Sequence, residues 1–427
     1  EMTSSLVGSE MCIRDRYNRL MYMMAELPTD MMKNGLGMPN ANLQDLEFLR
    51  FNSQNTFIKD MWKNCYSGIS RANTAIAKIP EIKMNESKKN RLIAEARTLR
   101  ALYYFNLVRF FGDVPLILDL KTVEDSKGPR DSKELIYDQI IEDLTFAEEH
   151  LPLRSEYSAS DEGRINKGAA KILFGKVYLT KGDFQKAKDK LAEVVEHESE
   201  YGFGLHKDYH ANWLRDTEAG IEAVLYIEYK EPPFQHNGEM ALAGPKYSIP
   251  GSLGISALNE ADIPTQELYD QFDNRDLRKK TNFKTEFAHL KTGEILKSSI
   301  PLSGKFWVEG LETGDRCDVN MHIIRYADAI LMYAEALNEV GKSTKALAML
   351  NRIRERAFGD DSGNFKPMSK DEFRTAILNE RRLEFPHEGH RWFDLVRTGT
   401  FIQRMKEHSA YAVSYTHLRA HETRRHL

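Results

Sequence analysis

Two histidines close to the C-terminus are of a type that binds metals. His387 and His390 stand three residues apart in the segment His-Glu-Gly-His. Zinc-binding helices instead place paired histidines four residues apart and add a third ligand. His417 and His421 have the four-residue spacing, but they lie in a terminal segment that we expect to be non-native. We therefore predict no metal site.

Charged residues are concentrated around the same segment, and paired carboxylates are the groups that hydrolyse glycosidic bonds. Arginines stand among these acids, and such neighbours keep carboxylates ionised rather than poised to donate a proton. The pattern favours a structural network of ion pairs and helix caps over a catalytic pair. The cluster consists of Glu380, Arg381, Arg382, Glu384, Arg391, Asp394 and Arg397.

Two other signatures of catalysis are incomplete or missing. Ala336–Ser343 (ALNEVGKS) is similar to a phosphate-binding loop, but it lacks the first glycine and follows a predicted helix where that motif requires a strand. The Gly-x-Ser-x-Gly elbow of serine hydrolases does not occur in the sequence. We predict no catalytic residue and no cofactor, which indicates a binding protein.

Aromatic side chains suit a different chemistry, because the apolar face of a sugar ring stacks on a flat aromatic ring. The chain has 4 Trp, 18 Tyr and 21 Phe. Most of them are expected in the core, as aromatic side chains usually are, but six lie in or beside a stretch that is rich in loops. We predict that these six contact a ligand: Trp213, Tyr229, Phe234, Tyr247, Phe306 and Trp307.

The elements that must position these residues are mainly helices. In Arg91–Phe111, apolar residues recur at steps of three and four, Gly112 ends the run, and Pro115 follows shortly after. Trp62–Ile79 and Leu135–Leu151 have the same period, and a proline follows each of them. The sequence therefore predicts three long helices in its first third.

Two later stretches have the plan of a tetratricopeptide unit, which is a pair of helices packed through small residues. Gly168–His197 carries Gly175 and Ala187 at positions where such units need small side chains. Asp328–Ala357 repeats these offsets. The first two of the long helices are candidates for a further pair.

The middle of the chain differs from this helical scaffold. Ile221–Lys230 is apolar and β-branched, as a strand requires. Glu231–Asn259 is rich in Gly, Pro and Ser, and Asn282–Asn320 lacks a helical period. Irregular stretches on a rigid scaffold are frequent sites of binding. We expect an all-α fold of tetratricopeptide-like helical pairs, with a loop-rich irregular insert that carries a few short strands.

Composition excludes several classes of protein. The 427 residues are 41% hydrophobic, and their charges nearly cancel to a net charge of -4, so the basic face of a nucleic-acid-binding domain is not indicated. No stretch of about 18 apolar residues is present to span a membrane as a helix. Cys12, Cys65 and Cys317 have neither metal-like spacing nor the pattern of a disulfide framework.

Both ends of the chain are unusual. Ser4–Tyr17 and Val413–Leu427 resemble translated sequencing-adapter read-through and have no clear amphipathic pattern. We expect residues 1–16 and 413–427 to be non-native. Residues 17–412 then form a single domain, with the helical scaffold at about 57–200 and 321–405 and the ligand-binding loops at about 201–320.

An ordered set of motifs over about residues 17–412 resembles the SusD/RagB family of starch-utilisation-type nutrient-binding lipoproteins. Trp62–Asn73 is similar to the family's early helix, and Glu95–Pro115 is similar to its central signature. Pro386-His387 departs from the family pattern, and the family's closing segment and lipid-bearing cysteine have no counterpart here. Other matching segments follow in the family's order: Tyr137–Pro152, Gly163–Ala170, Pro264–Arg278, Arg325–Ala357 and Glu380–Gly399.

The resemblance implies a non-catalytic, all-helical protein on the outer face of the outer membrane. An N-terminal lipid, missing from this chain, would anchor it. A TonB-dependent SusC-like transporter would receive the oligosaccharide or polysaccharide, or in some members the peptide, that it captures. The helical repeats by themselves leave an alternative open, which is a cytoplasmic tetratricopeptide-type adaptor that binds a protein partner.

Overall fold

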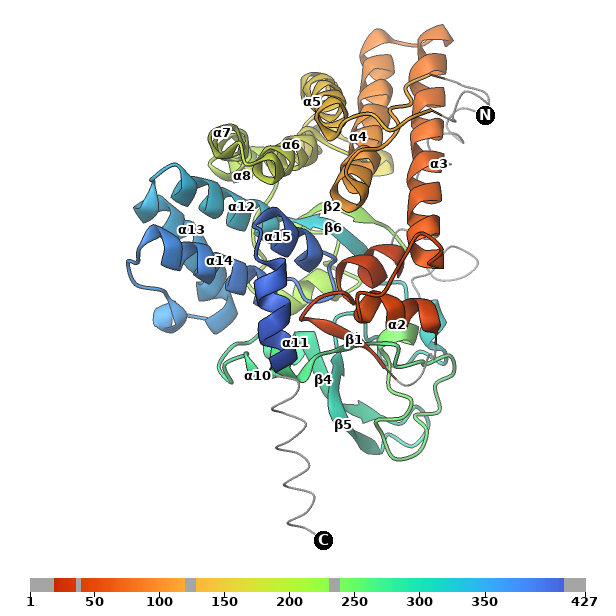
Figure 1. Ribbon diagram of the computed structural model, residues 1–427, viewed down its shortest axis with the longest axis vertical. Helices are drawn as coiled ribbons and strands as arrows, with labels where there is room; N and C mark the ends of the chain where they lie inside the picture. Colours follow the sequence, from red (N-terminus) through yellow and green to blue (C-terminus); the bar gives the residue numbers. More distant parts are fainter. Residues whose placement is uncertain (1–18, 36–39, 120–127, 230–238, 411–427) are drawn as a thin grey trace. The chain divides into compact units, whose positions relative to one another are not determined.

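The computed structural model describes residues 19–35, 40–119, 128–229 and 239–410 (Figure 1). The chain divides into two compact units. Unit 1 is described within Ile58–Gln235 and Val319–Ile377, and unit 2 within Arg19–Phe57, His236–Asp318 and from Leu378 onward. The first part of the expected loop region, residues 201–229, thus lies in unit 1. None of the described helices is long and apolar enough to cross a membrane.

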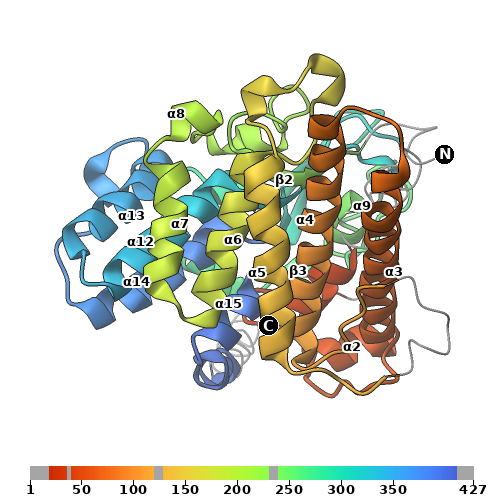
Figure 2. The same ribbon diagram turned by 90° about the horizontal axis from the view of Figure 1, so that it is seen from above.

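Unit 1 consists mainly of long helices that pack in the order of the chain, as the view from above shows (Figure 2). The expected helices and both tetratricopeptide-like pairs are present, so the predicted helical fold is confirmed. Helix α14 (Lys370–Glu384) begins in unit 1 and continues into unit 2. The others are α3 (Thr56–Lys78), α4 (Glu86–Phe111), α5 (Lys133–His150), α6 (Lys167–Lys181), α7 (Phe184–Val195), α8 (Glu198–Tyr201), α12 (Tyr326–Glu339) and α13 (Ser343–Phe358).

Small residues allow these helices to approach one another closely. A Cβ atom at Gly68 of α3 would collide with the ring of Tyr103 on α4. A Cβ at Gly175 of α6 would lie 2.5 Å from Cγ of Leu191 on α7. Because real Cβ atoms do not come this close to a neighbour, any larger side chain would push the helices apart. Gly175 therefore has the packing role that its position in the repeat predicts.

Two short strands complete unit 1. β2 (Ala223–Ile227) pairs with β6 (Met321–Arg325) in an antiparallel two-stranded sheet, with Tyr226 opposite His322. This confirms the strand predicted within Ile221–Lys230. The buried carboxylate of Glu222 holds the sheet to the helices, because it pairs with Arg325 at 2.5 Å and with Arg356 at 3.0 Å.

Unit 2 is built from shorter elements. β1 and β3 pair as one antiparallel sheet, and β4 and β5 form a hairpin with a turn at Gly293, whose φ is +70°. The hairpin lies in the stretch where no helical period was found. The elements are β1 (Met32–Asn34), α2 (Ala41–Glu47), α9 (Glu239–Ala243), β3 (Asp262–Pro264), α10 (Gln266–Asp270), α11 (Lys279–Asn282), β4 (Phe283–Ala288), β5 (Ile295–Ser303) and α15 (Arg391–Arg397).

Buried ion pairs join the parts of unit 2. Arg278 is fully buried and contacts Asp276 at 2.7 Å, Glu380 at 2.7 Å and Glu384 at 2.9 Å. Asp30, also fully buried, pairs with Arg382 and Arg391, each at 2.8 Å, and with Arg404. Asp394 accepts from Arg381 and Arg397. The charged cluster is thus the structural network that the sequence predicts.

Candidate binding site

The Tyr247 loop, residues 244–260 of unit 2, carries the most exposed of the predicted ligand contacts within the described residues. The Tyr247 side chain is 59% exposed. One carboxylate oxygen of the buried Glu260 accepts hydrogen bonds from the backbone N–H groups of Lys246 at 2.8 Å, Tyr247 at 2.9 Å and Ser248 at 3.0 Å. Charge-assisted bonds of this kind are the stronger ones. The loop therefore presents an aromatic ring from a fixed backbone.

The backbone of Glu260 itself is in the left-handed region, at φ +51°. This conformation costs about 1–2 kcal/mol for a residue with a Cβ atom. Its N–H donates to the carbonyl of Gly244 at 3.0 Å, and the next N–H, of Ala261, donates to Leu242 at 2.7 Å. The surrounding hydrogen bonds thus hold the strained residue in place, as is common where a loop has a function.

Trp307 lies in the same part of unit 2. Its ring meets that of Phe287 edge to face, with centroids 4.7 Å apart. Both rings belong to a hydrophobic cluster that also contains Ile249 and Leu253 of the Tyr247 loop. The buried Nε1–H of Trp307 has no hydrogen-bond partner among the described residues. Packing therefore anchors the Tyr247 loop and Trp307 on one shared core, and a polar atom of Trp307 has no partner among the described residues.

Three of the other predicted contacts are buried. Trp213 (4% exposed) packs on Tyr209, and the guanidinium of Arg325 lies 5.3 Å from its ring. Tyr229 (4%) and Phe306 (2%) are also enclosed by the protein. A ligand would reach these rings only after the surrounding side chains moved. Phe234 lies outside the described residues. Ligand contact by these residues stays a prediction. Of the predicted contacts that the structure describes, Tyr247 is the one that a ligand can reach most easily.

The structure adds aromatic residues that sequence analysis did not single out. Phe48 (59% exposed) and Phe51 (37%) follow α2 in unit 2, and Leu49 between them has a φ of +55°. The guanidinium of Arg50 lies 5.1 Å from the centroid of the Phe48 ring. The signal in the sequence was the run Phe-Leu-Arg-Phe directly after a helix that ends at residue 47. Large apolar residues that are exposed side by side often mark an interaction site, whereas single exposed ones are common on any protein surface.

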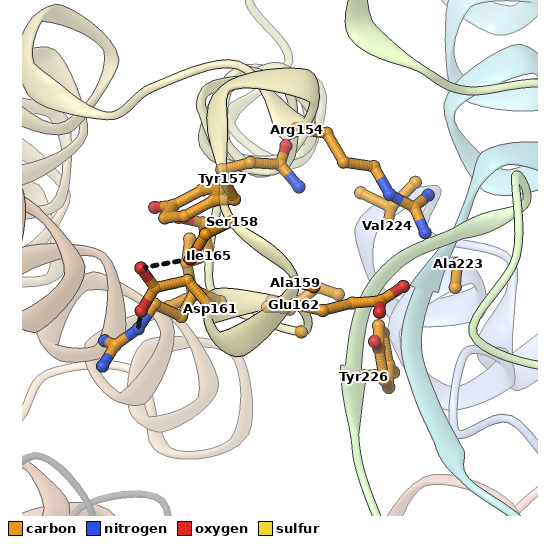
Figure 3. Close-up of a pocket in the computed structure, with 14 residues that line it drawn as sticks. Arg154, Tyr157, Ser158, Ala159, Asp161, Glu162, Ile165, Ala223, Val224 and Tyr226 are labelled. Carbon is orange, nitrogen blue, oxygen red and sulfur yellow. Dashed lines mark hydrogen bonds and ion pairs between the residues drawn. The ribbon is translucent and has the colours of Figure 1, made fainter.

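A pocket of about 230 Å³ is present in unit 1, between residues 154–166 and β2 (Figure 3). Arg154 donates to the carbonyls of Gly220 at 2.9 Å and Ala219 at 2.6 Å. Asp161 accepts from Arg164 at 2.8 Å. Burial raises the pKa of Tyr226, which also lines this pocket, to about 12. The pocket therefore combines charged groups with apolar residues of β2, and its tyrosine stays protonated at physiological pH.

Two buried aspartates that pair with arginines of the charged cluster are not suited to proton transfer. Burial raises the pKa of Asp394, but the guanidinium groups of Arg381 and Arg397 outweigh burial and hold it well below its usual range. The pKa of Asp30 is likewise low, because Arg391 and Arg382 outweigh its burial. His387 lies 3.4 Å from Asp262, and among the described residues no group of three potential ligands is placed to hold a metal ion.

Comparisons with known proteins agree with this fold. A family model described as SusD family matches residues 226–426, and one described as starch-binding associating with outer membrane matches residues 8–179. SusD-like protein P2 of Formosa agariphila is 31% identical over 380 residues, which are 80% of this chain and 72% of that protein. SusD-like protein P38 of the same organism is 27% identical over 405 residues, which are 86% of this chain and 77% of that protein.

Solved structures give the same result. A laminarin binding SusD-like protein superposes with a TM-score of 0.82 at 28% identity, covering 96% of this chain and 93% of its own. A SusD superfamily protein from Parabacteroides distasonis superposes with a TM-score of 0.80 at 26% identity, covering 93% and 88%.

Proposed function

This chain belongs to the SusD family, and on that premise we propose that it is a non-catalytic glycan-binding protein. It captures an oligosaccharide at the cell surface and delivers it to a TonB-dependent SusC-like outer-membrane transporter. The observation that carries the glycan assignment is the exposed Tyr247 ring, on a loop that the Glu260 carboxylate fixes through three backbone N–H groups.

A rigid exposed ring suits a sugar ligand for two reasons. The flat apolar face of a pyranose stacks on an aromatic ring, and a ring that is already held in place loses little conformational entropy on binding. Lys246 places its ammonium group 5.4 Å from the Tyr247 centroid, where it can donate hydrogen bonds to sugar hydroxyls at the edge of the ring. A platform of this kind has few polar contacts, so we expect weak binding.

Catalysis is not part of the proposal, because Arg278 pairs with Glu380 and Glu384, and Arg381 pairs with Asp394. A glycosidase needs one carboxylic acid that keeps its proton near neutral pH and a second carboxylate across the sugar. A carboxylate bound to arginine stays ionised and cannot be that acid. Release of reducing sugar from any bound glycan would contradict this part of the proposal.

Membership of the family supports the proposed location and partner. One of the two matching models is described as associating with the outer membrane, and we propose attachment there through an N-terminal lipid. The tetratricopeptide-type adaptor is disfavoured because the family match also covers unit 2, which has no place in a simple array of helical repeats.

Affinity electrophoresis of the purified protein through gels that contain laminarin, starch and other polysaccharides tests the proposal. We expect retardation in at least one gel, and we expect Tyr247→Ala to reduce the affinity for that glycan at least about tenfold, as loss of a central aromatic anchor does. Leu135→Ala on α5, 52% exposed, is the matched control and should bind like the wild type. No retardation by any glycan in the panel would contradict the proposal.

A further inference from the structure

The cavity of Figure 3 continues along the whole of β2. A second pocket of about 240 Å³ adjoins the first, and the two share Glu162–Ile165 on one side and Leu225 and Tyr226 on the other. The first pocket is lined by four consecutive residues of the strand, Ala223–Tyr226, and the second by the four residues Leu225–Glu228. We name this continuous space the β2-edge groove.

Consecutive lining residues show which side of the strand the groove follows. Side chains along a strand alternate between the two faces of the sheet, so a cavity over one face would be lined by every second residue. A cavity lined by four neighbours in a row lies against the edge of the strand, where backbone groups face the cavity. Ile323 of β6 also lines the second pocket, next to the irregular register between β2 and β6, so the groove opens onto one face at that end.

The backbone along this edge has hydrogen-bonding capacity left. Within the described residues β2 has β6 as its one hydrogen-bonded neighbour. Val224–Ile227 form no backbone hydrogen bonds to other described residues apart from that ladder. A strand with one neighbour turns the remaining N–H and C=O groups outward, and such groups are a template for another extended chain. Glycans offer no matching repeat of alternating donors and acceptors.

The opposite wall determines what kind of chain fits. In Figure 3, Glu162 reaches from the 158–163 loop toward Tyr226 on β2. Glu162 is exposed and has no hydrogen bond or ion pair with any described residue. The Tyr226 hydroxyl likewise has no hydrogen-bond partner there, and it would lie 3.4 Å from a Cβ atom built on Gly163. A glycine therefore faces the tyrosine hydroxyl across the groove.

Charge around the groove is acidic. Its lining contains two arginines, Arg154 and Arg164, against four carboxylates, Glu95, Asp161, Glu162 and Glu228. Arg164 is engaged by Glu95 at 2.6 Å and by Asp161 at 2.8 Å. The groove therefore favours a ligand with a positive charge near Glu162.

From these observations we propose that the β2-edge groove binds an extended peptide segment, which adds to β2 as a third strand and places a lysine or arginine beside Glu162. This is recognition by strand addition, in which main-chain hydrogen bonds supply affinity and side-chain pockets supply specificity. The groove shares no residue with the Tyr247 loop, and the proposal does not depend on glycan binding.

Hydrogen exchange of the full chain with a defined probe tests this proposal. The probe is a blocked hexapeptide of alternating threonine and valine with one central lysine. We expect slower exchange of amides within residues 223–228 when it binds. A version methylated on alternate backbone nitrogens should bind at least about tenfold more weakly, because it loses main-chain hydrogen bonds. A version with glutamate in place of lysine should also bind more weakly.

Matched variants separate this site from the rest of the protein. Glu162→Gln should weaken the lysine peptide two- to fivefold, the range of an exposed ion pair, whereas Glu149→Gln, an exposed acid on α5, should not. Tyr247→Ala should leave peptide binding unchanged. The proposal would be overturned if protection from exchange appeared only outside residues 223–228, or if laminarihexaose alone protected the same amides. It would also be overturned if the methylated peptide or the glutamate peptide bound as tightly as the lysine peptide.

Discussion

The contacts inside unit 1 and the contacts inside unit 2 span different distances along the sequence. In unit 1, neighbouring helices meet through small residues, as Gly175 does against Leu191. Its buried ion pairs span 43 residues between Arg100 and Asp143 and 134 residues between Glu222 and Arg356. In unit 2, Asp30 pairs with Arg391, 361 residues away. Each long helix has its own backbone hydrogen bonds, whereas segments of unit 2 that are far apart in the chain are joined by buried ion pairs. This difference predicts where each unit is most easily broken.

The largest effect is expected from Arg278 in unit 2. Arg278→Met leaves Asp276, Glu380 and Glu384 buried together without their cation, and breaking a buried pair on one side costs about 3–5 kcal/mol. Chemical denaturation should show this loss in the free energy of unfolding. Arg275→Met is the matched control, because its side chain is 64% exposed and its bond to Asp273 is a surface pair worth less than about 1 kcal/mol. Equal effects of the two variants would contradict the role of the buried network.

The next effect depends on pH and concerns Glu26. Burial, with a contribution from the charge of Asp262, raises the pKa of Glu26 from 4.5 to about 8. The hydrogen bonds from Gly389 and Glu388 and the charge of Lys305 lower this pKa, but by less. The folded state therefore keeps a proton that the unfolded chain releases above its own pKa. The free energy of unfolding should fall as the pH rises from about 4.5 to 8, by on the order of 4 kcal/mol, and level off above that.

Glu26→Gln separates this carboxyl from the other titrating groups of unit 2. The amide cannot ionise, so the variant should be more stable than the wild type at pH 8.5 and similar to it near pH 5. Thermal or urea unfolding at the two pH values measures the difference. If Glu26→Gln and the wild type had equal stability at pH 8.5 as well as near pH 5, a protonated Glu26 would not be the cause of the fall.

A smaller effect is expected in unit 1, where packing rather than charge is changed. Gly175→Val places methyl groups against Leu191, and overpacking of this kind costs about 1–3 kcal/mol. Adding Leu191→Ala should restore part of the loss, because the shorter side chain gives the new methyl groups room. Gly128→Ala is the control, since a Cβ there has no neighbour within 4 Å. If Leu191→Ala restored no stability to the Gly175→Val variant, the contact with Leu191 would not be the reason for the loss.

The same contrast explains how much could be predicted. The helical period located α4, and Gly112 and Pro115 marked its end, because these signals are local. Ion pairing was predicted for Arg382 from the charges around it, but its partner Asp30 was not, since nothing local links two residues 352 apart in the chain. The β4–β5 hairpin was also missed. Its strand β5 alternates between exposed and half-buried residues only in its first part.

The candidate site was predicted less completely, for a physical reason. A loop-rich region must still bury apolar surface, and aromatic rings such as Trp213 and Phe306 supply it. Residue type and position along the chain therefore cannot separate a core ring from an exposed one. Glu260 had no signal at all, because its role depends on the loop folding back so that residues 246–248 meet its carboxylate.

The smallest expected change in stability concerns the carboxylate of Glu260, and the same change should also affect glycan binding. Glu260→Gln keeps one acceptor oxygen but removes the charge, and neutral hydrogen bonds are about half as strong as charge-assisted ones. We expect a loss of about 1 kcal/mol in unfolding free energy. The affinity for the retained glycan should fall severalfold, although the Tyr247 ring is unchanged, because the backbone at 246–248 is held less firmly. Tyr247→Ala alone and combined with Glu260→Gln should then bind equally weakly. If Glu260→Gln weakened binding further in the absence of the ring, Glu260 would act on the ligand by a route other than the placement of Tyr247.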